Sequence, residues 1–232
     1  MKGKSSTPFL NKTLTINESL EINTKKMAKN ISLISLIITA AAFTTSAQTL
    51  KPFSDMDDKW GYQNESYQTV IPCQFEAAKE FSEGMAAVRN KVKVPDGNGL
   101  FQFDYLWGYI NLTGKIVIPC QYSEALIFLG ECAVVAKGNK YALIDKKGKA
   151  ITPFKYDEIA YMAEELTAVN IGKTQDGDEP GLWGFIDKTG KEVIPLNYYK
   201  VESFSEYDAT AKVTDQNFET YYIDTKGIRV KK

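Results

Sequence analysis

The sequence predicts an all-β fold: an array of about four and a half antiparallel three-stranded repeats that forms an open curved solenoid. Two observations predict it. A block of aromatic, glycine and turn residues recurs along the chain, and apolar and polar residues alternate within each block with the period of a strand. A small propeller-like closure is the alternative. We favour the open array because residues 51–59 are too short and polar to supply a closing strand.

The first part of each repeat is predicted to be a hairpin. In the copy that begins at Trp183, five residues form a strand and Asp187 to Gly190 form a tight turn. Gly184 removes a Cβ where another backbone or ring comes close. The return strand is expected to end at Pro195, which cannot donate to a β-ladder. Copies begin at residues 60, 107, 141, 183 and 220.

The second part of each repeat supplies a third strand. Aromatic or other large apolar residues follow the proline by three and by nine positions, and a strand of small apolar residues comes next. We expect this strand to form a hairpin with the Trp-Gly strand of the following repeat. One such unit cannot bury its aromatic face alone, so the units must stack. The small-apolar strands begin near Met85, Cys132, Leu166 and Ala209.

These motifs resemble the WG-repeat family. Residues 183–195 match its Trp-Gly hairpin almost letter for letter, and residues 81–84 (Phe-Ser-Glu-Gly) match its second half. The resemblance covers about residues 58–230 and implies a bacterial, often exported protein with no shared catalytic residues. The chain departs from the pattern at residues 64–67, which replace the Asp-x-x-Gly turn, and at Tyr141-Ala142, which replaces Trp-Gly.

The N-terminal region has the order of a secretory signal. A basic cluster ending at Lys29 precedes an apolar run, Ile31 to Phe43, and small residues then lead to a predicted cleavage site after Ala47. An uncleaved membrane anchor is the alternative, but the run is shorter than the roughly 18 residues that span a bilayer. The predicted organisation is an extension or disordered segment at 1–26, a signal peptide at 27–47, a linker at 48–57 and a repeat domain at 58–232. Export to the periplasm or the extracellular space follows.

Composition excludes several functions. The chain has no histidine, so Ser-His-Asp catalysis, histidine-ligated zinc and a histidine pH switch are excluded. Removing the six lysines and two glutamates of the leader from totals of 28 basic and 29 acidic residues leaves 22 and 27, a net charge of −5. An acidic domain is a poor partner for nucleic acid or anionic lipid. No cofactor or metal is predicted.

Recurring polar residues have structural explanations. The acids and the asparagine at the hairpin turns are expected to cap those turns, and no pair of carboxylates is singled out for glycoside hydrolysis. Two acidic glycine tips, at 96–99 and 176–179, are expected to be hairpin turns and not calcium loops. The cysteines are expected to be buried and unpaired. The turn residues are Asn111, Asp145, Asp187 and Asp224, and the cysteines are Cys73, Cys120 and Cys132.

Two long connections are the candidate binding region. The connection 89–106 reads as a hairpin extended beyond the repeat body, with alternating aromatic residues on one face, and the connection 170–182 occupies the same slot two repeats later. Binding residues of repeat proteins are usually found on such loops. Packing of the aromatic face on a neighbouring unit is the competing interpretation. The candidate ligand-binding residues are Phe101, Phe103, Tyr105, Asp176 and Asp178.

The sequence therefore favours an exported, non-catalytic binding or scaffolding module. Its expected partner is a protein or glycan of the cell envelope. A carboxylate-based hydrolase of the envelope and a purely structural spacer are the alternatives.

Overall fold

The computed structural model describes residues 49–160, 166–174, 178–205 and 207–231. The chain divides into two units, residues 1–48 and 49–232, and only the second is described. The predicted extension 1–26 and signal peptide 27–47 lie outside the described residues. Within the described ranges all the regular elements are β-strands, and no helix is long and apolar enough to cross a membrane.

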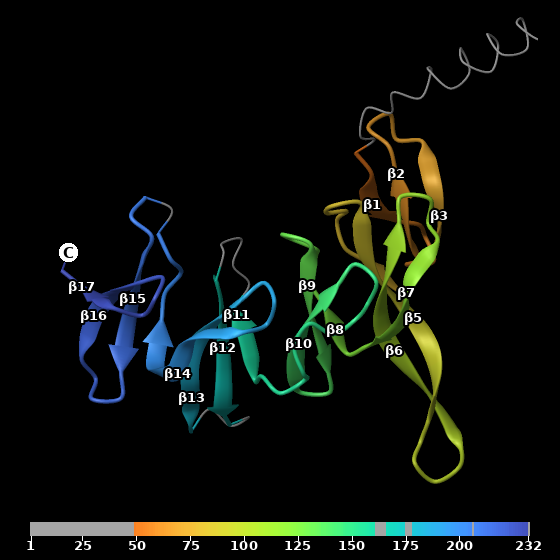
Figure 1. The fold of residues 1–232 in the computed structure, drawn as a ribbon. Coiled ribbons are helices and arrows are strands. Elements are labelled where there is room, and N and C mark those ends of the chain that lie inside the picture. Colours follow the sequence, from red (N-terminus) through yellow and green to blue (C-terminus); the bar gives the residue numbers. More distant parts are fainter. Residues whose placement is uncertain (1–48, 161–165, 175–177, 206, 232) are drawn as a thin grey trace, which may run out of the picture. The chain divides into compact units, whose positions relative to one another are not determined.

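The prediction of an all-β open array is confirmed. The strands form four antiparallel sheets, and none of these sheets closes into a barrel. The sheets follow one another along the chain (Figure 1). The first two are ordered β1-β2-β3 and β4-β5-β6-β7, with strands β1 (Lys51–Ser54), β2 (Trp60–Gln63), β3 (Thr69–Phe75), β4 (Ala77–Ala78), β5 (Met85–Pro95), β6 (Phe101–Asn111) and β7 (Ile116–Tyr122).

The remaining two sheets have three and seven strands. The first of them is ordered β10-β9-β8, and the second runs from β11 to β17 in sequence order because β14 is long enough to pair on both edges. Their strands are β8 (Glu124–Ala125), β9 (Cys132–Lys137), β10 (Lys140–Asp145), β11 (Glu158–Ala160), β12 (Leu166–Lys173), β13 (Pro180–Asp187), β14 (Glu192–Val201), β15 (Thr210–Asp215), β16 (Thr220–Asp224) and β17 (Arg229–Val230).

Each small-apolar strand pairs with the Trp-Gly strand of the next repeat, as the sequence predicts. The pairs are β5 with β6, β9 with β10, β12 with β13 and β15 with β16. The second and third sheets therefore combine strands from two consecutive repeats, and the seven-stranded sheet combines strands from three. The short strands β4, β8 and β11 were not predicted, because two or three residues carry no periodic signal.

The segment 48–57, expected to be a linker, contains a strand. β1 pairs with β2 from Lys51↔Gln63 to Ser54↔Trp60, and Leu50 is buried in the cluster around Tyr62. The strand forms because its main chain supplies the hydrogen bonds, and its place at a sheet edge tolerates Pro52 and polar side chains.

The return strands continue through their prolines, which was also not expected. Between Trp107↔Tyr122 and Tyr109↔Ile118 the return strand β7 has two more residues than β6, so a bulge forms around Pro119. β3 and β14 show the same irregularity. A bulge removes residues from the hydrogen-bond ladder, so a proline there loses no ladder bond.

The glycine of each Trp-Gly pair faces this bulge. A Cβ built on Gly108 would stand 2.5 Å from the carbonyl oxygen of Ile118, and Gly61 and Gly184 have equivalent contacts at 2.5 and 2.6 Å. Side chains cannot occupy that space, so the predicted close approach of a backbone at this glycine is confirmed.

Consecutive repeats stack through their hairpin turns. A Cβ on Gly114 would stand 3.0 Å from Cγ2 of Ile71, in the preceding repeat, and Gly148 has the same relation to Ile118. Gly190 and Gly227 approach Ile151-Thr152 and Ile194 in the same way. The turn glycine therefore has two reasons to be glycine, a positive φ and a close neighbour from the preceding unit.

The Phe-Ser-Glu-Gly segment adds polar contacts between the first two repeats. The Ser82 hydroxyl donates to the Phe128 carbonyl at 2.6 Å, and the Glu83 carboxylate accepts from the main-chain N–H groups of Gly130 and Glu131. Lys146 pairs with Glu83 and Glu131 at 3.1 and 2.9 Å. The Glu83 carboxylate therefore joins two units of the array.

Candidate functional site

Strands β5 and β6 extend beyond their sheet. They pair without interruption from Met85↔Asn111 to Pro95↔Phe101. β4 pairs only with Val88 and Arg89, and β7 reaches only to Trp107. Residues 90–95 and 101–106 therefore form a two-stranded ribbon with no other strand beside it in the described part of the chain (Figure 1). We call this segment the β5–β6 ribbon, and it confirms the predicted extended hairpin.

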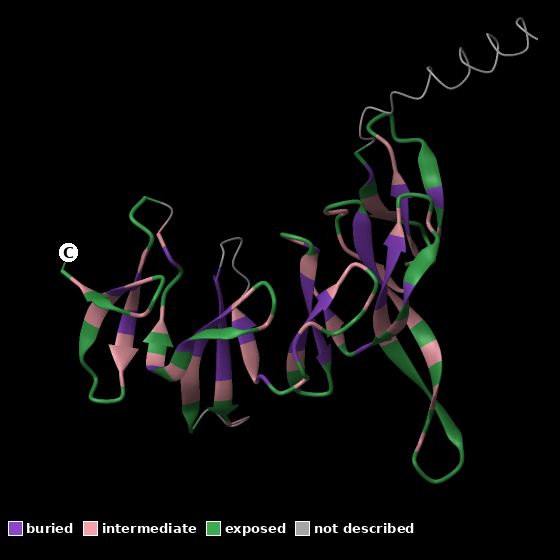
Figure 2. Cartoon of the chain, in the orientation of Figure 1, coloured by how far each residue is buried: buried purple, intermediate pink, exposed green. Residues whose placement is uncertain are grey.

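The aromatic side chains of the β5–β6 ribbon are open to solvent. Phe101, Phe103 and Tyr105 are 62, 63 and 48% exposed. Figure 2 shows the ribbon mostly in the colours of exposed and half-buried residues, in contrast to the buried strands of the sheets. These rings therefore do not form the core of a neighbouring repeat.

Basic side chains alternate with these rings on the same face. The register places Lys91 opposite Tyr105 and Lys93 opposite Phe103. The Nζ of Lys91 lies 4.9 Å from the ring centroid of Phe103, and that of Lys93 lies 4.2 Å from Phe101. Each lysine thus contacts the ring on its diagonal, within the range of a cation–π interaction.

Arg89 continues this pattern toward the sheet. Its guanidinium lies 5.9 Å from the Tyr105 ring and 5.5 Å from the Trp107 ring. None of the ion pairs found among the described residues involves Arg89, Lys91 or Lys93. One face of the ribbon is therefore both aromatic and positively charged, on a domain whose net charge is negative. Sequence reasoning identified the rings and missed the cations, although their spacing of two residues was visible.

Of the two predicted acidic residues, only Asp178 lies among the described residues. Asp176 lies outside the described residues. Asp178 is exposed in the connection between β12 and β13, away in sequence from the ribbon. The structure brings together Phe101, Phe103 and Tyr105 on β6, and Asp178 belongs to a different connection.

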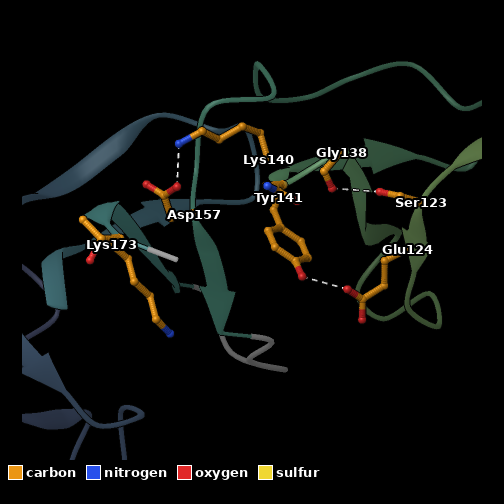
Figure 3. Close-up of a pocket in the computed structure, with 9 residues that line it drawn as sticks. Ser123, Glu124, Gly138, Lys140, Tyr141, Asp157 and Lys173 are labelled. Atoms are coloured by element: carbon orange, nitrogen blue, oxygen red, sulfur yellow. Dashed lines mark hydrogen bonds and ion pairs between the residues drawn. The ribbon is translucent and has the colours of Figure 1, made fainter. Parts of the chain in front are cut away.

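A second candidate is a polar pocket of about 750 Å³ beside β8, β10 and β12. Figure 3 shows Lys140 and Tyr141 leaving β10 in different directions, Lys140 toward Asp157 and Tyr141 toward Glu124. The Tyr141 hydroxyl donates to Glu124 at 2.7 Å, and Lys140 forms an ion pair with Asp157. Tyr141 stands where three other repeats have tryptophan, so a departure from the repeat pattern was the signal that could have found this pocket.

The charges of the pocket are satisfied within the protein. The hydrogen bond to Glu124, together with burial, raises the pKa of Tyr141 to about 12. Burial by itself would raise the pKa of Asp157, but the hydrogen bonds from Lys140 and the Gly172 N–H outweigh it and lower that pKa. Lys59 pairs with Glu76 at the corresponding positions of the first repeat, so the Lys140–Asp157 contact recurs as part of the scaffold.

The turn acids cap their turns, as predicted. The Oδ1 atom of each accepts hydrogen bonds from the N–H groups two and four residues later, at 2.9–3.1 Å. Asp96 caps the tip of the β5–β6 ribbon in the same way, so this acidic tip is a hairpin turn. Among the described residues no group of three or more cysteine or acidic side chains could hold a metal ion. The residues that cap the hairpin turns of the repeats are Asn111, Asp145, Asp187 and Asp224.

The three cysteines are unpaired, and each is half-buried. Burial raises the pKa of all three thiols. Raised thiol pKa values reduce the thiolate population, which is the reactive form.

The comparisons with known proteins agree with this architecture. Among curated proteins, none matches the chain. The family model described as "WG containing repeat" matches residues 60–91, 107–141, 142–174 and 183–209, more than half of the chain. These segments begin near the predicted repeat starts and contain the hairpins described above. The chain belongs to the WG-repeat family.

Proposed function

We propose that this chain is an exported, non-catalytic binding module in which the WG repeats form a scaffold and the β5–β6 ribbon contacts the ligand. The observation that carries the proposal is the exposure of three consecutive rings on one face of a ribbon that no other described strand covers. Solvent-exposed aromatic clusters on a rigid scaffold are typical of interaction sites. The expected ligand is a protein or a glycan of the cell envelope.

Catalysis by a pair of carboxylates has less support. A glycosidase needs one carboxyl group with a raised pKa so that it can act as an acid. In the polar pocket, Asp157 has a lowered pKa and is held by Lys140 and a main-chain N–H. Glu124 already accepts the Tyr141 hydrogen bond. These contacts favour a structural role for the pocket.

The proposal is tested by removing the ribbon. Replacing residues 91–105 with Asn-Gly would close β5 onto β6 at the Asn90–Leu106 pair with a two-residue hairpin turn. The full chain and this variant are compared on a glycan array and in pull-downs from envelope extract. We expect the variant to keep the thermal stability of the full chain. We expect it not to bind the ligand that the full chain retains.

A triple substitution separates the rings from the backbone of the ribbon. Phe101, Phe103 and Tyr105 are replaced by serine, and Leu112, Ile116 and Val117, which are 44–46% exposed on the next hairpin, are replaced by serine as the control. Loss of ligand only in the first variant supports the binding proposal. Unchanged retention in both variants and in the deletion favours the structural spacer.

A further inference from the structure

The open edge of β5 continues a row of main-chain groups that the sheet already uses. The N–H of Glu76 donates to the carbonyl of Arg89 at 2.8 Å, and the N–H of Lys79 donates to the carbonyl of Ala87 at 2.9 Å. Arg89 and Ala87 therefore direct their main-chain groups toward β4. The partner strand ends there, since β4 consists of Ala77 and Ala78 alone.

The same row extends along the β5–β6 ribbon without a partner strand. Main-chain groups of alternate residues point to the same side of a strand, and the register of β5 with β6 has no shift from Met85 to Pro95. Lys91 and Lys93 therefore direct their N–H and C=O groups to the edge that Arg89 uses. No strand of the described part of the chain pairs with that edge beyond Arg89. Pro95, which has no N–H, marks its far end.

The side chains beside this edge specify what could pair with it. On one face are the cations Arg89, Lys91 and Lys93, and on the other are Val92 and Val94, both half-buried. In an antiparallel pair, directly opposite residues share a face. A strand that adds here would place acidic residues opposite Lys91 and Lys93 most favourably, with β-branched apolar residues alternating on the valine face.

We propose that the open edge of β5 binds an extended peptide strand in which acidic and β-branched apolar residues alternate. The added strand would turn the ribbon into a three-stranded sheet, which is more stable than an isolated two-stranded hairpin. The inference rests on the proposed function and names its ligand class. The β5 strand of a second copy of this chain is not a suitable partner for this edge, because pairing β5 with β5 would bring lysines together.

The first test uses peptides of defined charge pattern. The full chain is titrated into labelled peptides of alternating Val-Glu, alternating Val-Lys, and a Val-Glu peptide of the same composition with its residues in separate blocks, and binding is followed by fluorescence anisotropy. We expect binding of alternating Val-Glu only. The variant Lys91→Glu/Lys93→Glu should bind alternating Val-Glu at least about tenfold more weakly and should acquire affinity for Val-Lys. Lys147→Glu/Lys149→Glu has the same charge change at another exposed hairpin and should leave the preference unchanged.

The second test asks whether the main chain takes part. Lys91→Pro removes an edge-facing N–H that the β5–β6 ladder does not use, whereas Lys91→Gln removes the charge and keeps that N–H. We expect Lys91→Pro to bind alternating Val-Glu more weakly than Lys91→Gln. Hydrogen exchange should show new protection of the Lys91 and Lys93 amides when the peptide is bound.

Two outcomes would overturn strand addition while leaving the proposed function intact. One is equal binding of the alternating and blocked Val-Glu peptides, with no new protection of the Lys91 and Lys93 amides. The other is binding of a polyuronate glycan, added as a separate probe, that depends on the rings and lysines without amide protection. If the variant without the ribbon retained every ligand that the full chain retains, that result would instead contradict the proposed function itself.

Discussion

Gly108 lies against the backbone of Ile118, so that a Cβ at position 108 would stand 2.5 Å from the Ile118 carbonyl oxygen. The bulge that contains Pro119 produces this contact, and the same contact recurs at Gly61 and Gly184. The Trp-Gly signature is therefore a consequence of strand geometry. It identifies the scaffold and carries no information about a ligand.

Repeat three shows how the scaffold accommodates the loss of this glycine. Ala142 occupies the position, and the return segment is not a strand there but makes only isolated bridges at Tyr156 and Ala150. The buried Thr152 accepts a hydrogen bond from the N–H of Leu143 through its hydroxyl, at 2.9 Å. We infer that the altered return segment makes room for the Cβ of Ala142.

Gly108→Ala is expected to destabilise the domain by about 3 kcal/mol, because the added methyl group meets main-chain atoms that cannot rotate away. Ala142→Gly, at the equivalent position, should cost only about 1 kcal/mol, the usual backbone-entropy cost of glycine. Denaturant unfolding measures both. Equal effects of the two substitutions would show that the bulge does not depend on the glycine.

Tyr67→Gly is expected to stabilise the domain by about 1 kcal/mol. Tyr67 has a φ of 60° at a turn position where the other repeats have glycine with φ near 80°. The side chain is 82% exposed, so its removal loses little packing. Thermal unfolding measures the gain, and Met56→Gly, at a fully exposed residue whose φ is not positive, is the comparison. A lowered melting temperature for Tyr67→Gly would contradict the strain argument.

The contact of Glu83 with the second repeat should make stability depend on pH. Burial tends to raise the Glu83 pKa, but the N–H groups of Glu131 and Gly130 and the ammonium of Lys146 outweigh it, so the folded-state pKa is below the ordinary value of 4.5. A carboxyl group with a lowered folded pKa contributes its stability above the unfolded pKa and loses it as the pH falls through the folded pKa.

Glu83→Gln should therefore lower stability at pH 7 by at most about 1 kcal/mol, because the side chain remains partly exposed. The difference between wild type and variant should shrink as the pH falls below 4.5. Unfolding curves recorded from pH 7 to pH 3 measure it. Glu65→Gln, an exposed carboxylate in the turn of the first repeat, is the control. A difference that does not vary with pH would rule out the charge as its source.

The three cysteines should titrate as three free thiols under denaturing, non-reducing conditions. In the folded protein, Cys120 and Cys132 should react slowly with DTNB, because burial raises the pKa of both thiols and lowers the thiolate fraction. Fewer than three thiols in the denatured chain would indicate a disulfide that the structure does not contain.

Sequence periodicity predicted the hairpins well because a strand and its turn are local. The turn acid accepts from N–H groups only two and four residues away, so the row from Asn111 to Asp224 could be explained without a tertiary structure. Strand β1 and the passage of the return strands through proline were missed. Both depend on which neighbouring strand supplies hydrogen bonds, and side-chain patterns do not record that.

The candidate site shows the same difference between what local sequence predicts and what tertiary contacts decide. Alternation in the long connection identified Phe101, Phe103 and Tyr105 as one face, because the period of a strand alone places them together. The polar pocket joins Tyr141, Glu124 and Asp157 from three separated strands or turns, so spacing in the sequence could not reveal it.

The sequence by itself determined the repeat architecture, the capped turns and the aromatic face, since each follows from residues close together in the chain. Only the tertiary structure decided whether the aromatic face is covered or exposed, where the partner strand of β5 ends, and which lysines stand over which rings. These depend on the register between strands and on the absence of a neighbour beside the ribbon in the described residues. Composition excluded histidine chemistry; the geometry of one sheet edge points to the ligand class that we propose.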